Sequence, residues 1–236
     1  MKFPNHIYFY PEKPVLVHRD QDLVEMFCTD PDWVAELKYN GVRCVLTIIN
    51  GEVSFWTRHG APIKTIDLTD DRCKELVKEV TDAVPSTGHY QFEGELRHKK
   101  VTGLQYRLVL WDCLIYNDEY LNKLTYDERR ELVLKHFSVA PDAQDKVINL
   151  SEYKRRITVI HQFPDDFRRV FIEFADRQAG NTGLYKYNSM RHLIESDEFE
   201  GLVFKNRNGK LNLGRNTNPD SKWMMKIRIE TGRHKF

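Results

Sequence analysis

Residues 33–57 read WVAELKYNGVRCVLTIINGEVSFWT, and this stretch decides the fold. Residues 33–37 indicate a short strand that ends before Lys38, while residues 42–49 and 53–57 form two further runs rich in β-branched and aromatic side chains. Asn50-Gly51 stands between these two runs. Asn-Gly favours a tight hairpin because both turn positions need a positive φ. The stretch therefore predicts antiparallel strands joined by short turns.

Helical patterns and further strands follow this stretch. Apolar residues at helical spacing cover residues 73–80, and a capping box at Thr125 and Glu128 opens a helix through Phe137. A third apolar stripe covers residues 167–174. Further strands are expected at residues 105–116, 201–206 and 223–229. The pattern predicts an α+β fold in which antiparallel sheets are flanked by helices.

The bulk properties are typical of one soluble globular domain. The chain has 236 residues, so residues 1–236 are expected to form a single domain around one sizeable core. The most apolar run, residues 108–116, is short and carries Asp112, and the N-terminus lacks a signal-peptide pattern. A cytoplasmic monomer with no membrane association is therefore expected. The net charge of +1 means that any basic surface for nucleic acid must be local.

Lys38 is the first candidate for chemistry. It stands where a strand enters the turn Asn40-Gly41, and on its own it would be an ordinary solvated lysine. Its other interpretation is a nucleophilic amine, which must lose a proton before it attacks. Other stretches also combine charged residues with apolar or aromatic ones: Glu93-Gly94-Glu95-Leu96, Leu110-Trp111-Asp112, Glu200 to Lys205 and Lys222 to Arg228. Each of them alone has an ordinary explanation, such as turn acids, a core tryptophan or a soluble edge strand.

In this order the stretches resemble the covalent nucleotidyltransferase superfamily, which comprises DNA ligases, RNA ligases and mRNA capping enzymes. Residues 38–43 resemble its K-x-D-G-x-R element, residues 57–60 the basic element that follows, and residues 93–96 its D-G-E-L element. Residues 111–112 are similar to its aromatic-acid pair, residues 200–205 to E-G-x-V-x-K, and residues 225–228 to the final basic element. The elements span residues 36–228, nearly the whole chain. The resemblance implies the adenylation domain of an ATP-dependent polynucleotide ligase, with an ATP-grasp-like ligase fold.

The resemblance also implies a role for each matched residue. Lys38 would take up AMP from ATP, and Lys226 and Arg228 would hold the α-phosphate. Trp111 would stack on the base and Glu95 would contact the ribose, while Glu200 would support a Mg²⁺ or Mn²⁺ ion. The remaining nucleotide contacts implied are Glu36, Leu37, Arg43, Arg58 and Lys205, of which Arg58 would also engage the nicked strand.

Three departures from the family pattern stand out. Asn40 occupies the usual position of an aspartate beside the nucleophile, and Arg228 occupies that of the second lysine. Arginine keeps the positive charge but binds phosphate as a planar fork. The chain also ends eight residues after Arg228, so no OB domain is expected after the adenylation domain.

Several functions remain open at this point. Sealing of nicks with a 5′-phosphate and a 3′-hydroxyl in duplex DNA is favoured over RNA joining, and the nucleic acid could be DNA, RNA or a hybrid. An mRNA capping guanylyltransferase, which would use GTP, is the third candidate, and a catalytically inactive binding module is the last. NAD as donor is disfavoured because few residues precede Lys38. Candidate phosphate contacts are Arg58 and the clusters 97–100 and 233–235.

Overall fold

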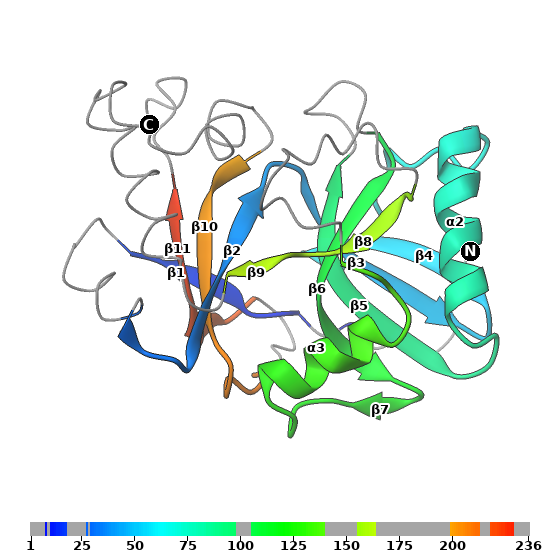
Figure 1. Ribbon diagram of the computed structural model, residues 1–236. Helices are drawn as coiled ribbons and strands as arrows, with labels where there is room; N and C mark the ends of the chain where they lie inside the picture. The colour runs from blue at the N-terminus through cyan, green and yellow to red at the C-terminus, as the bar shows by residue number, and fades with distance from the viewer. Residues whose placement is uncertain are drawn as a thin grey trace.

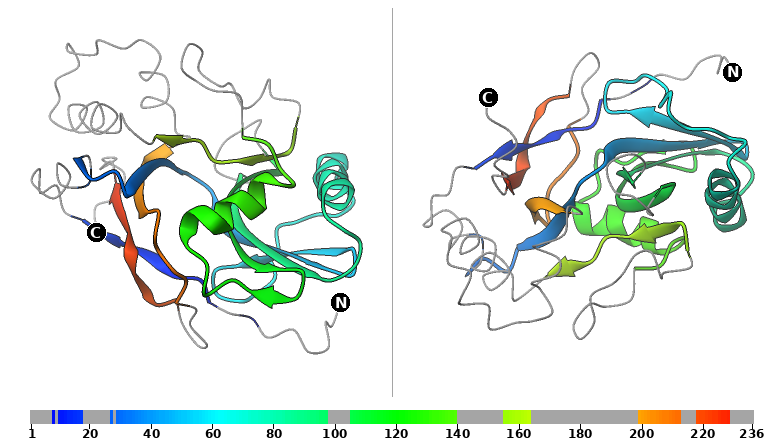
Figure 2. Two further views of the ribbon diagram at one scale, coloured as in Figure 1. Left: turned by 60° about the horizontal axis from the view of Figure 1, so that its bottom comes forward. Right: turned by 90° about the horizontal axis from the view of Figure 1, so that it is seen from above.

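The computed structural model describes residues 8, 10–17, 27, 29–97, 105–139, 155–163, 199–212 and 218–228. Two β-sheets lie side by side in this part of the chain, with one helix beneath their junction and another at the far end of the second sheet (Figure 1). Figure 2 shows the same arrangement from two other directions. No helix among the described residues is long and apolar enough to cross a membrane.

The first sheet has five strands in the order β1-β11-β10-β2-β9. Their bounds are β1 Lys13–Leu16, β11 Asp220–Arg228, β10 Phe199–Asn206, β2 Trp33–Tyr39 and β9 Gln162–Phe163. The second sheet has the order β4-β3-β5-β6-β7, with β8 also pairing with β6. Its strands are β3 Val42–Ile49, β4 Glu52–Thr57, β5 His89–Arg97, β6 Arg107–Tyr116, β7 Glu119–Tyr120 and β8 Ile157–Val159.

The stretch that decides the fold joins the two sheets. β2 belongs to the first sheet and β3 to the second, and the chain passes between them through Asn40 and Gly41. A side chain on Gly41 would lie 2.7 Å from the carbonyl oxygen of Leu96, so only glycine fits this crossing without a shift. The predicted hairpin is confirmed, since β3 pairs antiparallel with β4 and Asn50 and Gly51 have φ of 49° and 80°. The expected end of the first strand is wrong, because β2 continues through Lys38 and Tyr39.

Both described helices pack against the second sheet. α2, Asp71–Ala83, buries Cys73, Leu76 and Val80, as the apolar spacing predicts. α3, Tyr126–Leu134, begins with the predicted capping box and ends before the expected Phe137. It contacts β6, and its Asp127 amide donates to the carbonyl of Arg207 just after β10, so α3 also touches the first sheet's connections. The third predicted helix, 167–174, lies outside the described residues.

The expectation of antiparallel sheets is correct for most pairs but wrong for two. β1 pairs parallel with β11, and β8 pairs parallel with β6. Both parallel strands are short and come from distant parts of the sequence, so no local hairpin signal could announce them. The last strand also begins at Asp220, before the expected residue 223.

Two apolar clusters lie on opposite faces of the first sheet. One cluster lies within the second sheet and its helices and takes in Trp223 and Met224 of β11. The other contains Leu37, Phe199 and Leu202 and covers the opposite face of the first sheet. Because side chains alternate along a strand, the neighbours of these residues point toward the second sheet. This alternation turns Glu36 and Lys38 into the space between the sheets.

Candidate active site

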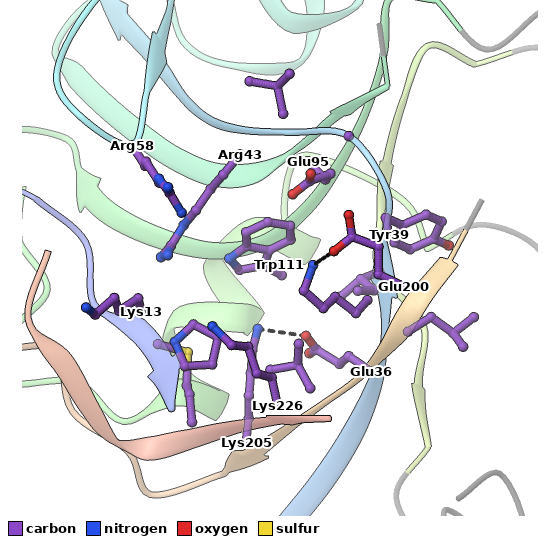
Figure 3. A pocket seen from close by; sticks show the side chains of 18 of the residues that line it. Lys13, Glu36, Tyr39, Arg43, Arg58, Glu95, Trp111, Glu200, Lys205 and Lys226 are labelled. Carbon is purple, nitrogen blue, oxygen red and sulfur yellow. Dashed lines mark hydrogen bonds and ion pairs between the residues drawn. The ribbon is translucent and has the colours of Figure 1, made fainter. Parts of the chain in front are cut away.

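A cavity of about 460 Å³ lies between the two sheets (Figure 3). This volume is in the range of small-molecule sites. Ten of the eleven residues singled out from the sequence line it: Glu36, Leu37, Lys38, Arg43, Arg58, Glu95, Trp111, Glu200, Lys205 and Lys226. The eleventh, Arg228, ends β11 opposite Gly201, and the position of its side chain lies outside the described part of the structure. The family elements therefore converge on one cavity although they are spread over the chain.

Lys38 and Glu200 form an ion pair in this cavity. Lys38 projects from β2 and Glu200 from the neighbouring strand β10, and their side chains are 19% and 26% exposed. The pair is therefore neither fully solvated nor sealed in the core. An amine held in this way is positioned, yet it can exchange its partner when another charged group enters.

A β-bulge directs Glu200 toward Lys38. Phe199 pairs with Tyr39 and Gly201 pairs with Lys38, so Glu200 is an extra residue in β10. Phe199 and Leu202 consequently both face the apolar cluster, and Glu200 faces the cavity. In a regular strand Glu200 would share the face of Leu202. Gly201 has a φ of 146°, a backbone conformation that residues with a side chain rarely adopt. This explains why a glycine follows Glu200.

Trp111 also comes from a bulge. Glu93 pairs with Asp112 and Gly94 with Leu110, so Trp111 is an extra residue of β6 at this point. Its indole lines the cavity, and the ammonium of Lys205 lies 5.5 Å from the ring centroid. Trp111 enters the cavity, while Asp112, its neighbour in the sequence, is buried.

A buried polar group forms the floor of the cavity. The Lys205 ammonium lies 2.7 Å from the Glu36 carboxylate, and both side chains are almost fully buried. The Tyr126 hydroxyl donates to Glu36, and Lys205 donates to the Tyr126 oxygen at 3.2 Å. Burial lowers the pKa of Lys205, and Glu36 opposes that shift. Burial also raises the pKa of Tyr126, which keeps its hydroxyl as a donor.

Basic residues from the second sheet line the rim of the cavity. Arg43 on β3 donates to the Glu93 carboxylate and to the main-chain oxygen of Glu12, so its guanidinium is fixed in place. Arg58 follows β4, is exposed, and donates through Nε to His59 at 2.9 Å. Glu95 lies on β5 directly opposite Arg43 in the ladder. Among the described residues, the rim therefore combines one cation that is fixed by two partners, Arg43, with one that donates to its neighbour, Arg58.

Two expectations from the sequence need correction. The Leu37 side chain packs in the apolar cluster on the far face of the first sheet, so only its main chain can border the cavity. Arg97, expected to bind a phosphate, is 1% exposed and packs over the Tyr39 ring at 5.1 Å. The other members of the two basic clusters, 98–100 and 233–235, lie outside the described residues.

Sequence reasoning missed several residues of the site. Lys13 and Pro14 reach the cavity from β1, and Tyr126 reaches its floor from α3. Arg129 supports the floor, since it forms a bidentate pair with Asp112 at 2.8 and 3.0 Å. The sequence signal for Tyr126 was its place in a well-capped helix. Arg129 lies in residues 127–132 of that helix, which look more like DNA ligases than RNA ligases, and β1 gave no signal. Their roles depend on contacts between distant segments.

The donor set fits a divalent cation that is partly held by a substrate. No three His, Cys, Asp or Glu side chains in the described part of the chain are close enough to hold a metal by themselves. Mg²⁺ commonly uses one or two carboxylates together with substrate phosphates and water. Glu200, with Glu95 in the same cavity, can supply such carboxylates.

Comparison with known proteins assigns the fold. No protein-family profile and no curated protein matches the sequence. Among solved structures, mycobacterial DNA ligase D in complex with ATP and MES superposes with a TM-score of 0.51 at 15% identity, over 83% of this chain and 54% of that one. The ligase domain of M. tuberculosis LigD gives 0.52 at 15% identity, over 92% and 59% of the two chains.

A third similar structure is the ATP-dependent DNA ligase of bacteriophage T7 in complex with ATP. Its TM-score is 0.52 at 15% identity, over 94% of this chain and 69% of that one. The described part of the chain thus has a fold that it shares with solved ligases. More particularly, it has the fold of the catalytic domain of ATP-dependent DNA ligases, and it spans little more than half the length of the two mycobacterial chains.

Proposed function

We propose that this protein is an ATP-dependent polynucleotide ligase that forms a lysyl-AMP intermediate on Lys38 and seals nicks in duplex DNA. The observation that carries the proposal is the convergence of the six family elements on the cavity that holds the Lys38 amine. The similar ligases that were solved with ATP make ATP the expected nucleotide.

The residues of the cavity suit the first chemical step. The Lys38 amine must leave Glu200 and lose its proton before its lone pair can attack the α-phosphorus of ATP. A phosphorus–nitrogen bond forms, the bond to the bridging oxygen breaks, and pyrophosphate leaves with the electron pair. Lys226, which lines the same cavity, and Arg228 after it are proposed to neutralise charge on the phosphate oxygens.

The other residues are proposed to bind the nucleotide. Trp111 offers its indole face to adenine, and Glu95 offers a carboxylate to the ribose hydroxyls. The buried pair of Glu36 and Lys205 supplies one acceptor and one donor, which match the amino group and the ring nitrogen of the adenine edge. Arg43 and Arg58 complete the rim on the side of the second sheet.

A divalent cation, Mg²⁺ or Mn²⁺, is proposed at Glu200 together with the phosphates of ATP. When bound, such an ion neutralises charge on the triphosphate. Glu200 then has two tasks: it holds Lys38 in the resting arrangement, and it offers its carboxylate to the cation.

The later steps transfer AMP to a 5′-phosphate end and then join that end to a 3′-hydroxyl. Arg58, which is exposed at the rim of the cavity, is proposed to engage the nicked strand. Because the net charge of this sequence is only +1, few phosphates are expected to be neutralised, so substrate binding is expected to be only shallowly dependent on salt.

The test is covalent labelling followed by sealing. The protein is incubated with Mg²⁺ and ATP, GTP or NAD labelled in the transferred nucleotide, and label on the chain is measured. ATP alone should label it, with an acid-labile bond, whereas labelling by GTP alone would indicate a capping guanylyltransferase. Nicked duplexes of DNA, RNA and hybrid strands then distinguish DNA sealing from RNA joining. Labelling without sealing of any duplex would contradict the ligase proposal.

A further inference from the structure

We propose that Lys13, on the N-terminal strand β1, binds a phosphate at the mouth of the cavity, namely the β,γ-phosphates that leave as pyrophosphate. The inference rests on the proposed function and adds a residue that none of the six family elements contains. Lys13 lines the cavity from the edge of the first sheet, beside Pro14.

The main chain around Lys13 is fixed on both sides of the residue. The Lys13 amide donates to the Pro219 carbonyl at 2.9 Å, and Asn218 donates to the Pro11 carbonyl at 2.8 Å. The Glu12 carboxylate accepts from the Trp223 indole at 2.7 Å, and the Glu12 carbonyl accepts from Arg43. These contacts hold the segment against β11 and against an arginine of the cavity, so the start of the Lys13 side chain is well positioned.

The Lys13 ammonium can change partners easily. Its ion pair with Asp220 measures 3.3 Å, and the two side chains are 48% and 69% exposed. Exposed pairs of this kind contribute little free energy. A polyanion in the cavity can therefore take the ammonium from Asp220 at small cost.

The position of Lys13 suits a leaving group. Figure 3 shows Lys13 and Arg58 on one side of the cavity and Glu200, the partner of Lys38, on the other, with Trp111 and Lys226 between them. In phosphoryl transfer the attacking and leaving atoms lie roughly in line across the phosphorus. A nucleophile at Lys38 and an α-phosphate beside Lys226 therefore direct the leaving pyrophosphate toward Lys13 and Arg58.

The charges at the cavity favour a polyanion on that side. Six cationic side chains line the cavity against three carboxylates, although the whole chain carries a net charge of only +1. All three carboxylates belong to the nucleophile, floor or ribose positions: Glu200, Glu36 and Glu95. None of the three carboxylates has a proposed role beside Lys13 and Arg58. These two side chains therefore make their side of the cavity positive.

The test separates binding from chemistry. In a Lys38→Ala background, which cannot react, ATP and AMP affinities are measured with Mg²⁺ by titration calorimetry, with and without Lys13→Ala. Loss of a charge-assisted contact should weaken ATP binding about tenfold to a hundredfold and leave AMP binding within about twofold. Lys13→Arg should recover most of the ATP affinity. Lys74→Ala, which removes an exposed lysine paired with Asp71 on α2, is the matched control and should change neither.

The catalytic arm uses the Lys38-containing protein. Lys13→Ala should slow single-turnover labelling by ATP by a similar factor and leave sealing of a pre-adenylated DNA nick unchanged, because that step releases no pyrophosphate. Equal losses in both steps, or equal losses of ATP and AMP affinity, would assign Lys13 to the nucleic acid or to the fold and overturn the inference. Unchanged ATP affinity would overturn it directly. If neither ATP nor AMP binds the protein before Lys13 is altered, the proposed function itself fails.

Discussion

Arg129 with Asp112, and Lys38 with Glu200, are two ion pairs at the junction of the sheets. They differ in burial and in the number of hydrogen bonds that join the two members of each pair. Arg129 and Asp112 are 0% and 3% exposed and make two parallel hydrogen bonds, and Arg129 also donates to the carbonyls of Leu124 and Gly209. Lys38 and Glu200 are 19% and 26% exposed and share one short contact.

The difference shows that the burial of an ion pair decides whether it mainly stabilises the fold or can open for a reaction. A buried pair whose donors and acceptors are all satisfied is costly to break, because removal of one partner leaves a buried charge. A partly exposed pair beside a cavity is expected to lose less when it opens. We therefore expect the Arg129 pair to determine stability and the Lys38 pair to determine activity.

Lys38→Ala tests the expectation that the Lys38 pair determines activity, and it should have the largest effect. Labelling by ATP and sealing of nicks should both fall below detection, because the proposed nucleophile is gone. The free energy of unfolding in urea should change by less than about 1 kcal/mol, since the lost pair is partly exposed. A variant that still takes up label would place the nucleophile on another residue.

Arg129→Met tests the expectation that the Arg129 pair determines stability. It should lower the free energy of unfolding by about 3–5 kcal/mol, because the buried Asp112 carboxyl would lose its partner. Urea unfolding measures the loss, and the double change Arg129→Met with Asp112→Leu should recover part of it. A single variant that is as stable as the parent protein would show that the buried pair does not hold the two sheets together.

Trp111→Ala probes a residue between the cavity and the buried ion pair. Trp111 lines the cavity, while its neighbour Asp112 is buried. ATP binding should weaken by about 1–3 kcal/mol, the scale of base–aromatic stacking, and Trp111→Phe should be mild. Titration calorimetry with ATP gives both values. Equal losses for the two substitutions would indicate that the indole acts in packing rather than in stacking.

Glu12→Gln extends the comparison of buried and exposed charged groups to Glu12, the residue before β1. Burial raises the pKa of the Glu12 carboxyl above its ordinary value of 4.5. The folded protein then binds this proton more tightly than the unfolded chain, so the contribution of Glu12 to stability falls as pH rises above about 4.5. Glutamine can still accept from Trp223 and does not titrate.

The Gln variant should therefore be more stable than the parent at neutral pH, with a smaller decline in stability as the pH rises above about 4.5. Urea unfolding across this range measures the decline. An identical decline in both proteins would show that Glu12 does not contribute to it.

Asn40→Asp should have the smallest effect. Asn40 lies in the crossing between β2 and β3, and aspartate is tolerated in similar turns. Labelling and sealing should stay within about threefold of the parent protein, a change of less than about 1 kcal/mol. Loss of labelling in a folded variant would mean that the missing charge beside Lys38 is required in this protein.

Much of the fold could be predicted because its signals are local. Asn50-Gly51, the capping box at Thr125 and the apolar spacing of α2 each act over a few residues, and the structure has all three features. The strands β1 and β8 could not be predicted, since each is short and pairs in parallel with a segment far away in the sequence. The site was predictable residue by residue only through the family resemblance.

The sequence by itself determined which chemical groups this protein has: a lysine beside a tight turn, paired acids, an aromatic in an apolar strand and alternating basic residues near the end. Only the tertiary structure decided where their side chains point. A bulge turns Glu200 into the cavity, and another bulge lies at Trp111, which also lines it. Burial removes Arg97 from the surface, and the ladder brings Lys13 to the mouth. The reason is physical: alternation along a strand follows from the chain alone, but a bulge or a parallel partner depends on the neighbouring strand.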